Sequence, residues 1–326
     1  MRFEPDFRIA VIIINYNSGF LIKKCLEHLS HQTLSFFRVI VVDNASCDGS
    51  IDGLDEIFPF VQFIKSDINL GFAAGNNLAI FKVEDCEWIA LLNPDAFPDP
   101  NWLQELALAA KKHQQFVFFG SQMRAADTPG LLDGTGDVLH ACGLSWRRDH
   151  GVKIKNGTLS EGEIFGPCAA AAMYSRSALL EVNGFDESYF CYHEDIDIAF
   201  RLRLLGYRCW YVPTAVVDHI GSGITGKHSK FSTYYGHRNL LWTFLKNMPG
   251  PLLFFYMPWH VFMSLAAIFV GALRGQAMLI VQAKIDALRS ISGVLDKRRI
   301  IQDSRTVGSL NILSVLARGI WPLIKR

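Results

Sequence analysis

The segment GFDESYFCYHEDID contains five carboxylates, of which four are considered as site candidates: Asp186, Glu194, Asp195 and Asp197. A single acid in the first turn of a helix has a structural use, because it faces unpaired N–H groups and the positive end of the helix dipole. That use does not explain the pair of Glu194 and Asp195, which follows several aromatic residues. Paired acids in aromatic surroundings are a common catalytic arrangement. The segment therefore predicts an active site.

A second group of residues could bind a metal ion. Asp95 follows a strand-like run directly, in Asn93-Pro94-Asp95, and His219 follows another such run. Taken alone, Asp95 would be a turn or capping residue and His219 a buried core histidine. Mg2+ and Mn2+ prefer oxygen ligands and keep coordination sites for substrate phosphates, and imidazole also suits Mn2+. We therefore expect Asp95 and His219 to be the protein ligands of a divalent cation.

The glycine-rich segment GSGITGKH, at 221–228, matches two phosphate-binding patterns only in part. His228 stands where a P-loop has the Ser or Thr that holds Mg2+, and Lys246 stands where a dinucleotide-binding unit needs an acid. Our hypothesis is a loop that closes over a bound diphosphate, with Lys227 or His228 in contact with it.

Strands and helices alternate in the part of the chain that must position these residues. Apolar runs predict strands at 9–14, 39–42, 61–64, 88–92 and 116–119. Apolar spacing predicts helices at 21–29 and 102–110, a helix that begins at 48, another that ends near 82, and a further one that begins at 194. This order predicts a doubly wound α/β sheet. Ligands bind beyond the carboxyl ends of the strands in such sheets. Asp43, Gly71 and Asp95 all fall near that edge.

Two later segments lack this alternation. Residues 121–165 have no clear periodicity, and we expect an irregular excursion that shapes an acceptor pocket. Residues 166–174 (GPCAAAAMY) are small where bulk is expected, which indicates that another element packs closely against them.

The bulk properties exclude some classes of protein. The 326 residues suffice for one large or two modest domains, and a net charge of +1 gives no sign of nucleic-acid binding. Seven cysteines without a CxxC pair favour a reducing compartment. Glu4 and Asp6 precede the first short apolar run, so we expect a buried strand there and no signal peptide.

The composition changes after Lys246. Residues 247–273 contain no Asp, Glu, Lys or Arg, and the 22 residues at 252–273 meet the length of about 20 needed to cross a membrane. The chain beyond Arg274 is basic and amphipathic, which is typical of helices that attach to anionic lipid surfaces. We expect this region to associate with membrane lipids, whether it spans, re-enters or lies flat. The alternative is a helical subdomain that packs on the sheet or forms a homodimer.

Five motifs in this order resemble a known family: IIINYN, VVDNASCDGS, NLGFAAGNN, LLNPDA, and GFDESYFCYHEDIDIAFRLRLLGY followed by a histidine. The chain resembles the inverting, GT-A-fold glycosyltransferases of family 2, and looks closest to the bacterial rhamnosyltransferase-like branch that builds cell-surface polysaccharides. The resemblance covers about residues 8 to 245. It implies a Rossmann-like, mostly parallel central sheet in a domain at 1–245, followed by a membrane-associated helical region at 246–326.

The resemblance also implies a donor site. Asn15 and Asp43 would lie near the donor nucleotide, with Asp43 in contact with the base or ribose. The donor site would further be lined by Gly71, Phe72 and Asn76.

The remaining implied roles concern the metal and the proton. Asn93-Pro94-Asp95 stands where the family has its DxD metal motif. Since the first acid is Asn93 here, binding of Mg2+ or Mn2+ depends on Asp95, together with His219. Asp195 would be the catalytic base, and Glu194 would position or assist it.

Together these features predict a metal-dependent inverting glycosyltransferase on the cytoplasmic face of a bacterial inner membrane. The expected donor is dTDP-L-rhamnose or a similar nucleotide sugar, and the acceptor a saccharide or a polyprenyl-diphosphate-linked saccharide. One alternative is a non-catalytic nucleotide-sugar-binding assembly partner, which would not need the acids Glu194 and Asp195. Another is a nucleotidyltransferase, which predicts a loop rich in glycine and lysine after the first strand, where Asn15-Tyr16-Asn17-Ser18-Gly19 stands.

Overall fold

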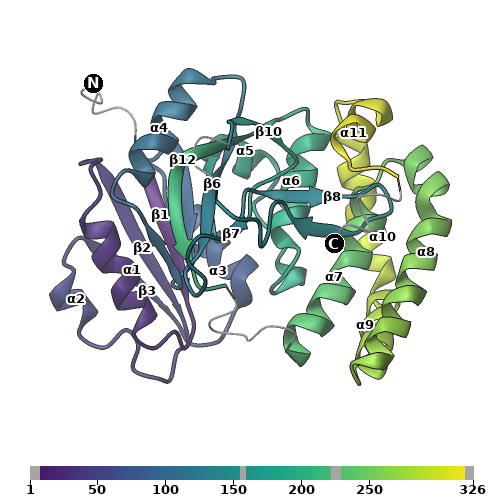
Figure 1. The fold of residues 1–326 in the computed structure, drawn as a ribbon, viewed down its shortest axis with the longest axis horizontal. Coiled ribbons are helices and arrows are strands. Elements are labelled where there is room, and N and C mark those ends of the chain that lie inside the picture. Colours follow the sequence, from purple (N-terminus) through teal and green to yellow (C-terminus); the bar gives the residue numbers. More distant parts are fainter. Residues whose placement is uncertain (1–7, 155–158, 222–228, 320–326) are drawn as a thin grey trace.

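The computed structural model describes residues 8–154, 159–221 and 229–319, with a ten-stranded mixed sheet at its centre (Figure 1). β5 (Ala96–Pro98) pairs with β12, and β7 (Leu132–Gly134) pairs with β6. The order across the sheet is β10 (Gly162–Ile164), β12 (Cys209–His219), β6 (Phe118–Ala125), β11 (Ala171–Ser175), β4 (Trp88–Leu92), β1 (Ile9–Asn15), β2 (Phe37–Asn44) and β3 (Val61–Ser66).

Strand β1 divides the core between the two faces of the sheet. Its residues alternate in direction, so that Ile9, Val11 and Ile13 join one apolar cluster and Ala10 and Ile12 the other. β1 pairs in parallel with β2 and β4, and β2 with β3. The carboxyl ends of these strands therefore meet at one edge, as the sequence predicts.

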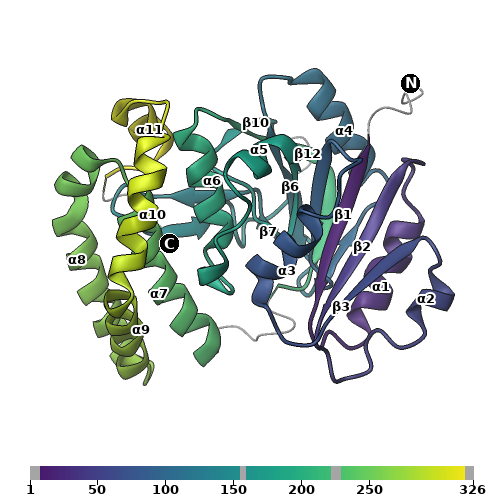
Figure 2. The same ribbon diagram turned by 180° about the vertical axis from the view of Figure 1, so that it is seen from behind.

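Helices cover both faces of the sheet (Figures 1 and 2). Helices α1 (Leu21–Ser30) and α4 (Trp102–Lys112) contribute to the apolar cluster on one face. The cluster on the other face receives α3 (Gly71–Ile80), α5 (Arg176–Glu181) and α6 (Glu194–Leu204). The α/β class and the central strands predicted from the sequence are confirmed.

Two local predictions were wrong. The helix expected from Asp48 is instead the short α2 (Leu54–Ile57), because Gly49 and Gly53 adopt positive φ angles of 72° and 69° that keep the chain in turns. The segment 121–165 is not wholly irregular. It holds the end of β6, then β7, β8 (Asp137–Leu139), β9 (Ser145–Arg147) and β10. Strands of three residues are too short to show a periodic pattern.

The expectation of close packing at 166–174 is confirmed. A Cβ atom added to Gly166 would lie 2.5 Å from the Cβ of Ala199, on α6. The adjoining β11 is buried between β4 and β6. This contact holds the middle of α6 against the segment that leads into β11.

The C-terminal helices stand beside the sheet, on the side away from β3 (Figure 1). They are α7 (Lys230–Asn247), α8 (Gly250–Leu273), α9 (Ala277–Arg289), α10 (Ile291–Asp303) and α11 (Ser309–Val315). Helix α7 contacts α6 as well as α9 and α10, so it joins this region to the sheet. The domain boundary at 245/246 stays a prediction.

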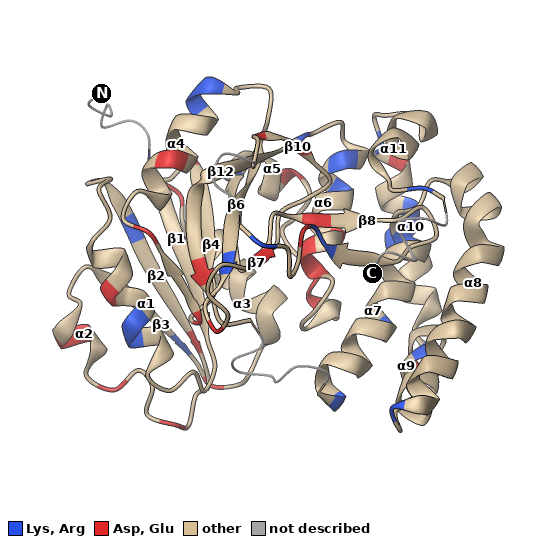
Figure 3. Ribbon diagram, in the orientation of Figure 1, with Lys and Arg blue, Asp and Glu red and all other residues tan. Residues whose placement is uncertain are grey.

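Helix α8 carries no charged side chain along its length (Figure 3). It is the one described helix that is long and apolar enough to cross a membrane by length and composition. Most of its apolar surface is exposed, and Phe254 is 87% and Phe269 70% exposed. So large an exposed apolar surface marks an interaction site.

Candidate active site

The predicted metal ligands, Asp95 and His219, lie side by side. β5 pairs antiparallel with β12 in a register that sets Ala96 opposite His219, and Asp95 precedes Ala96. The Nε2 atom of His219 lies 3.4 Å from Oδ1 of Asp95, and both side chains are buried. On its other ring nitrogen, Nδ1, His219 contacts Asp133 at 2.7 Å. A carboxylate behind a histidine in this way orients metal-binding imidazoles.

The chemistry of these residues fits a divalent cation. Burial favours the neutral form of His219, but hydrogen bonds to Asp133 and Asp95 outweigh burial and raise the pKa of the imidazole. A cation would take the place of that proton between His219 and Asp95. The two side chains would supply one carboxylate and one imidazole ligand, leaving positions for substrate phosphates.

Asn93, the first residue of the Asn93-Pro94-Asp95 motif, holds the turn in place. Its backbone N–H donates to the carbonyl of Ala170 at 2.9 Å, and its carbonyl accepts from the N–H of Ala96 at 3.1 Å. These bonds anchor the turn to the segment that leads into β11 and aim the following Asp95 toward β12. The structure therefore gives Asn93 a role in positioning Asp95.

Asn15 and Asp43 lie next to one another where β1 and β2 end. They are register partners, and Nδ2 of Asn15 donates to Oδ1 of Asp43 at 2.9 Å. The same amide donates to the hydroxyls of Ser46 and Ser50, each at 3.0 Å. This network rigidifies a polar edge at the carboxyl end of the sheet, where a nucleotide is expected.

The glycine motif at the start of α3 contacts the loop that leads to the predicted catalytic acids. The backbone N–H groups of Phe72 and Ala73 donate to the carbonyl of Phe190, at 2.6 and 3.3 Å. Gly71 has a φ of 79°, and a Cβ atom there would lie 2.5 Å from Phe190. Only glycine permits this approach. Asn76 braces the turn by donating to the carbonyl of Phe72 at 2.9 Å.

The loop before α6 is strained and is held by α7. Phe190, Tyr192 and His193 have positive φ angles of 64°, 69° and 66°, which L-residues rarely adopt. The buried amide of Asn239 donates to the carbonyls of Tyr189, Cys191 and Tyr192, at 3.0, 2.9 and 2.8 Å. Asn239 is therefore a positioning residue for this loop. The sequence analysis did not single it out.

Glu194 and Asp195 open α6, as predicted, and lie close to a third acid, Asp137. Burial raises the pKa of all three carboxyls, and the charge of Asp195 raises those of Glu194 and Asp137 further. Oε2 of Glu194 has no hydrogen-bond partner among the described residues. Asp195 is partly exposed and accepts the N–H of Ile196 at 2.8 Å. A partly exposed carboxyl with a raised pKa can accept a proton from a bound substrate.

Arg147, on β9, connects the two groups of acids. It donates to Asp133, behind His219, and to Sγ of Cys168 at 3.2 Å. Its pKa is raised although burial opposes its charge, because Cys168, Asp133, Asp137 and Asp195 surround it. Arg147 thus places one positive charge between the metal ligands and the acids of α6.

A further group of possible metal ligands lies beside this arginine. Ligand atoms of Asp137, Cys168 and Asp195 fall within 4.8 Å of one another. A cation there would be repelled by the guanidinium of Arg147. Asp95 and His219 therefore remain the predicted metal ligands.

Three of these residues were missed by the sequence analysis: Asp133, Asp137 and Arg147. All come from the 121–165 segment, where short strands bring them to the sheet edge. The only signal in the sequence was the presence of charged residues in a segment expected to shape a pocket. Burial, which separates them from ordinary surface charges, depends on contacts with β6 and β12.

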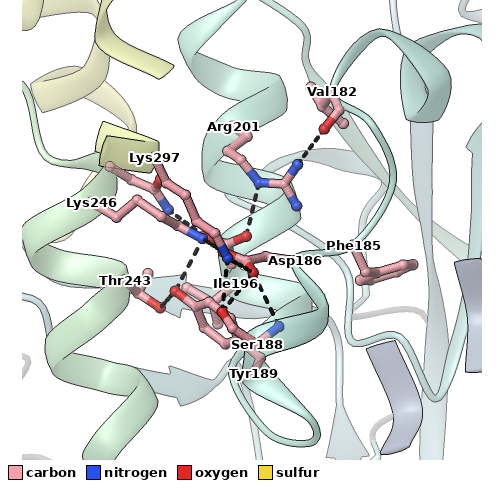
Figure 4. Close-up of polar contacts among 12 residues, drawn as sticks. Val182, Phe185, Asp186, Ser188, Tyr189, Ile196, Arg201, Thr243, Lys246 and Lys297 are labelled. Carbon is pink, nitrogen blue, oxygen red and sulfur yellow. Dashed lines mark hydrogen bonds and ion pairs between the residues drawn. The ribbon is translucent and has the colours of Figure 1, made fainter. Parts of the chain in front are cut away.

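Two of the four candidate carboxylates in the GFDESYFCYHEDID segment serve another purpose. Asp186 contacts Lys246 and Lys297, each at 2.5 Å (Figure 4). Asp197 contacts Lys246 and Arg201, each at 2.8 Å. Although burial opposes charge, Lys246 and the other partners lower the pKa of both carboxyls. The sequence analysis gave catalytic roles only to Glu194 and Asp195, and the ion pairs give Asp186 and Asp197 a structural role. They hold α6, α7 and α10 together.

The proposed diphosphate-closing loop, with Lys227 and His228, lies outside the described residues. Gly221, which precedes it, lies near the side chains of Asp133 and His219. The hypothesis about this loop stays a prediction.

Comparison with known proteins places this site in a family. The model of the family "Glycosyl transferase family 2" matches residues 10–182, more than half of the chain. The chain belongs to glycosyl transferase family 2. The matched region includes Asn15, Asp43, the start of α3 and Asp95, and it ends before Glu194 and Asp195.

Curated relatives are similar at modest identity. A protein of Mycobacterium tuberculosis (strain ATCC 25618 / H37Rv), N-acetylglucosaminyl-diphospho-decaprenol L-rhamnosyltransferase, is 27% identical over 245 residues, which cover 67% of this chain and 78% of the relative. The rhamnosyltransferase WbbL of Escherichia coli (strain K12) is 26% identical over 225 residues, covering 65% of this chain and 83% of the relative. The similarity to rhamnosyltransferases expected from the motifs is confirmed.

Solved structures agree on the fold. The structure of GalNAc-T7 with UDP, GalNAc and Mn2+ superposes with a TM-score of 0.62 at 13% sequence identity. The match covers 78% of this chain and about half (49%) of that neighbour. The mannosyltransferase PcManGT from Pyrobaculum calidifontis, in complex with GDP-Man and Mn2+, has a TM-score of 0.54 at 18% identity and covers 94% of this chain and 88% of its own. At these identities the likeness shows the fold alone, and it confirms the GT-A architecture.

Proposed function

We propose that this glycosyltransferase moves a sugar from a nucleotide-sugar donor, dTDP-L-rhamnose, to a saccharide on a polyprenyl diphosphate, with inversion at the anomeric carbon. The product would enter bacterial cell-surface polysaccharide biosynthesis. The observation that carries the proposal is the assembly of Asp95, His219 and Asp195 at one sheet edge, linked through Asp133 and Arg147. The names of the rhamnosyltransferase relatives support the choice of donor and acceptor.

The residues divide the work between donor and acceptor. Asn15 and Asp43 hold the nucleoside at the ends of β1 and β2, and the start of α3 lines the donor site. Asp95 and His219 hold Mg2+ or Mn2+, which neutralises the diphosphate charge when it is bound. Arg147 adds a fixed positive charge on the side of Asp133.

Asp195 receives the proton in the transfer step. The acceptor hydroxyl oxygen forms a bond to the anomeric carbon while the bond from that carbon to the diphosphate oxygen breaks. The nucleoside diphosphate leaves with the electron pair, and the hydroxyl proton passes to the carboxylate of Asp195. A single displacement inverts the configuration. Burial raises the pKa of Asp195, which favours proton uptake, and burial together with the charge of Asp195 raises the pKa of the neighbouring Glu194.

The membrane-associated face is the outer surface of α8, and α8 lies flat in this proposal. Its inner side is tied to the domain at His260, whose Nδ1 donates to the carbonyl of Cys142 at 2.9 Å and whose ring stacks on Phe244 at 4.2 Å. Leu252 and Gly271, near the two ends of α8, are buried as well. Crossing a bilayer would break these contacts, whereas lying on the cytoplasmic surface of the inner membrane keeps them.

A surface variant tests the membrane face. The double substitution of Phe254→Glu and Phe262→Glu should reduce flotation with vesicles that contain phosphatidylglycerol by at least about tenfold, because each exposed phenylalanine contributes about 1.5–3 kcal/mol when buried. Phe36→Glu, on the sheet domain and 62% exposed in the folded chain, is the matched control. Equal flotation of all three proteins would contradict this face.

A transfer assay tests the reaction itself. The full-length protein is incubated with a divalent cation, a prenyl-diphosphate-linked N-acetylglucosamine and one nucleotide sugar at a time: dTDP-L-rhamnose, UDP-glucose or GDP-mannose. The product is examined by NMR. We expect transfer from dTDP-L-rhamnose with the anomeric configuration opposite to that of the donor. Retention of configuration, or no transfer from any donor by folded protein, would refute the proposal.

A further inference from the structure

A cavity of about 370 Å3 lies between helices α7, α8 and α9, next to the active site. His193, which lines it, is the residue directly before Glu194. The largest of the described cavities, about 570 Å3, is elsewhere, between β10 and α11, and does not include the predicted site residues. The cavity at α7–α9 therefore is the one that adjoins both the catalytic acids and the membrane-facing helix.

The polar wall of this cavity carries positive charge at Arg274, and a second cation, Lys284, does not line the cavity but lies within electrostatic reach of the lining residue His237. His237 of α7 and Arg274 at the end of α8 line it. Lys284 of α9 acts electrostatically on His237: burial and the charge of Lys284 lower the pKa of His237 to about 4. Burial also lowers the pKa of Lys284 to about 8. Neither Lys284 nor Arg274 forms a hydrogen bond or ion pair with another described side chain.

Acidic partners for these cations are scarce. Residues 230–289 contain a single acid, Asp286. That carboxylate accepts from the hydroxyl of Tyr234 at 2.9 Å and pairs with Arg289 at 3.1 Å. His260 on α8, also within electrostatic reach of Lys284, has a buried Nε2 atom without a hydrogen-bond partner among the described residues. Arg274 is exposed and Lys284 is partly exposed, so both cations are accessible to pair with an anionic ligand.

The opposite wall of the cavity is apolar and continues to the exposed surface of α8. It is formed by Leu240, Ala267, Val270 and Ile280. Val270 is also one of the exposed apolar residues of α8. A ligand here would meet cations at one end and, at the other, the surface that we assign to the membrane.

We infer that this cavity binds the diphosphate and the first prenyl units of the lipid-linked acceptor, with Lys284 and Arg274 contacting the diphosphate. This inference rests on the proposed function, because it assigns a place to the acceptor of that reaction. The diphosphate lies against the cationic wall and the prenyl chain leaves along α8 toward the membrane. The attached sugar then extends past His193 toward Asp195.

A binding experiment with farnesyl diphosphate tests the inference. The full-length protein in detergent is titrated in buffer with a chelator, so that no divalent cation captures the probe at Asp95 and His219. Lys284→Gln and Arg274→Gln are compared with Arg299→Gln, an exposed cation on α10 that does not line the cavity. Inorganic pyrophosphate and phosphatidylglycerol vesicles are the competing ligands, and donor binding with Mn2+ is measured on every variant.

We expect Lys284→Gln and Arg274→Gln to weaken farnesyl diphosphate binding by at least about tenfold, since each removes a charge contact of the ligand. Arg299→Gln should match the parent, and pyrophosphate should bind at least about tenfold more weakly than farnesyl diphosphate, because it lacks the apolar contact. Donor binding should be unchanged in all variants, which also shows that they are folded.

Three results would overturn the inference. Equal binding of farnesyl diphosphate by all three variants would show that Lys284 and Arg274 do not contact the ligand. Pyrophosphate as tight as farnesyl diphosphate would indicate a site for free phosphate, and full displacement by vesicles would indicate a site for lipid headgroups. Absence of donor binding by the parent protein would instead refute the proposed function.

Discussion

Two pairs of acids, separated by fewer than a dozen residues, meet opposite surroundings in this molecule. Asp186 and Asp197 face Lys246, Lys297 and Arg201, and their pKa values are lowered. Glu194 and Asp195 face another acid, Asp137, and their pKa values are raised by burial. Compensated acids stabilise a fold, whereas acids kept short of positive charge are able to take up protons. Local charge balance, not the type of residue, therefore separates the structural acids from the acids that we propose to be catalytic.

The largest expected effect is on turnover. Asp195→Asn should lower kcat by about 10³-fold, because the amide cannot accept the acceptor proton. Donor binding, measured by calorimetry with Mn2+, should stay within about twofold of the parent. If turnover of Asp195→Asn stays within tenfold of the parent, the catalytic base would be Glu194 or Asp137 instead.

The second effect is on stability and concerns the other pair. Asp197→Asn leaves the buried Lys246 with less compensation, so we expect the free energy of unfolding to fall by about 3–5 kcal/mol. In the fraction that remains folded, kcat should change by less than about threefold. Urea unfolding and an activity assay at low temperature measure both. A large loss of kcat with unchanged stability would place Asp197 in the catalytic site.

The loop between the two pairs gives a smaller effect. Asn239→Ala removes three hydrogen bonds to the strained loop, which we expect to lower kcat by about 10- to 100-fold through misplacement of Asp195. Asn247→Ala is the matched control, because it removes a buried amide of the same helix that donates to Asp197 at 2.8 Å. The control should lose stability but keep kcat. Similar kcat values in Asn239→Ala and Asn247→Ala would show that Asn239 contributes to stability but does not position Asp195.

The smallest effect is a difference in the pH dependence of stability. Because the folded-state pKa of Asp195 is raised above 3.8, the stability linked to its protonation is present at acidic pH and lost as the pH rises through the raised value. Asp195→Asn should therefore be more stable than the parent by about 1 kcal/mol at neutral pH, and the gain should shrink at acidic pH.

The sign is opposite for Asp197, whose pKa is lowered. The contribution of the Asp197 carboxylate to the free energy of unfolding is full above pH 3.8, the ordinary pKa of Asp. It is lost as the pH falls through the lower pKa of Asp197 in the folded state. The deficit of Asp197→Asn relative to the parent should thus be full at neutral pH and shrink in strong acid. Unfolding curves at several pH values measure both variants. Parallel curves for the two variants would contradict the opposite charge balance.

Much of the fold was predictable because the signals are local. Continuous β-branched runs identified β1 and β2, and helical spacing after Glu194 identified α6. The placement of Asp95 beside His219 was also predicted, from residue chemistry and the family motifs. By contrast, the short strands β7 to β9 follow from pairing with distant segments, and their residues Asp133, Asp137 and Arg147 could not be placed.

The division between the two pairs of acids was not predictable for the same reason. The lysines that compensate Asp186 lie 60 and 111 positions away along the chain, at Lys246 and Lys297. No pattern within the GFDESYFCYHEDID segment distinguishes acids that will meet these lysines from acids that will not. Only the packing of α7 and α10 against α6 separates them.

The sharpest test of the metal site is a titration of the parent protein and of Asp95→Asn with dTDP-L-rhamnose, with and without Mn2+. We predict that the parent binds the donor at least about tenfold more tightly when Mn2+ is present, and that Asp95→Asn loses this gain while its weak metal-free binding stays the same. Donor binding that is indifferent to Mn2+ in the parent, or a full Mn2+ effect in Asp95→Asn, would contradict the assignment of the metal to Asp95 and His219.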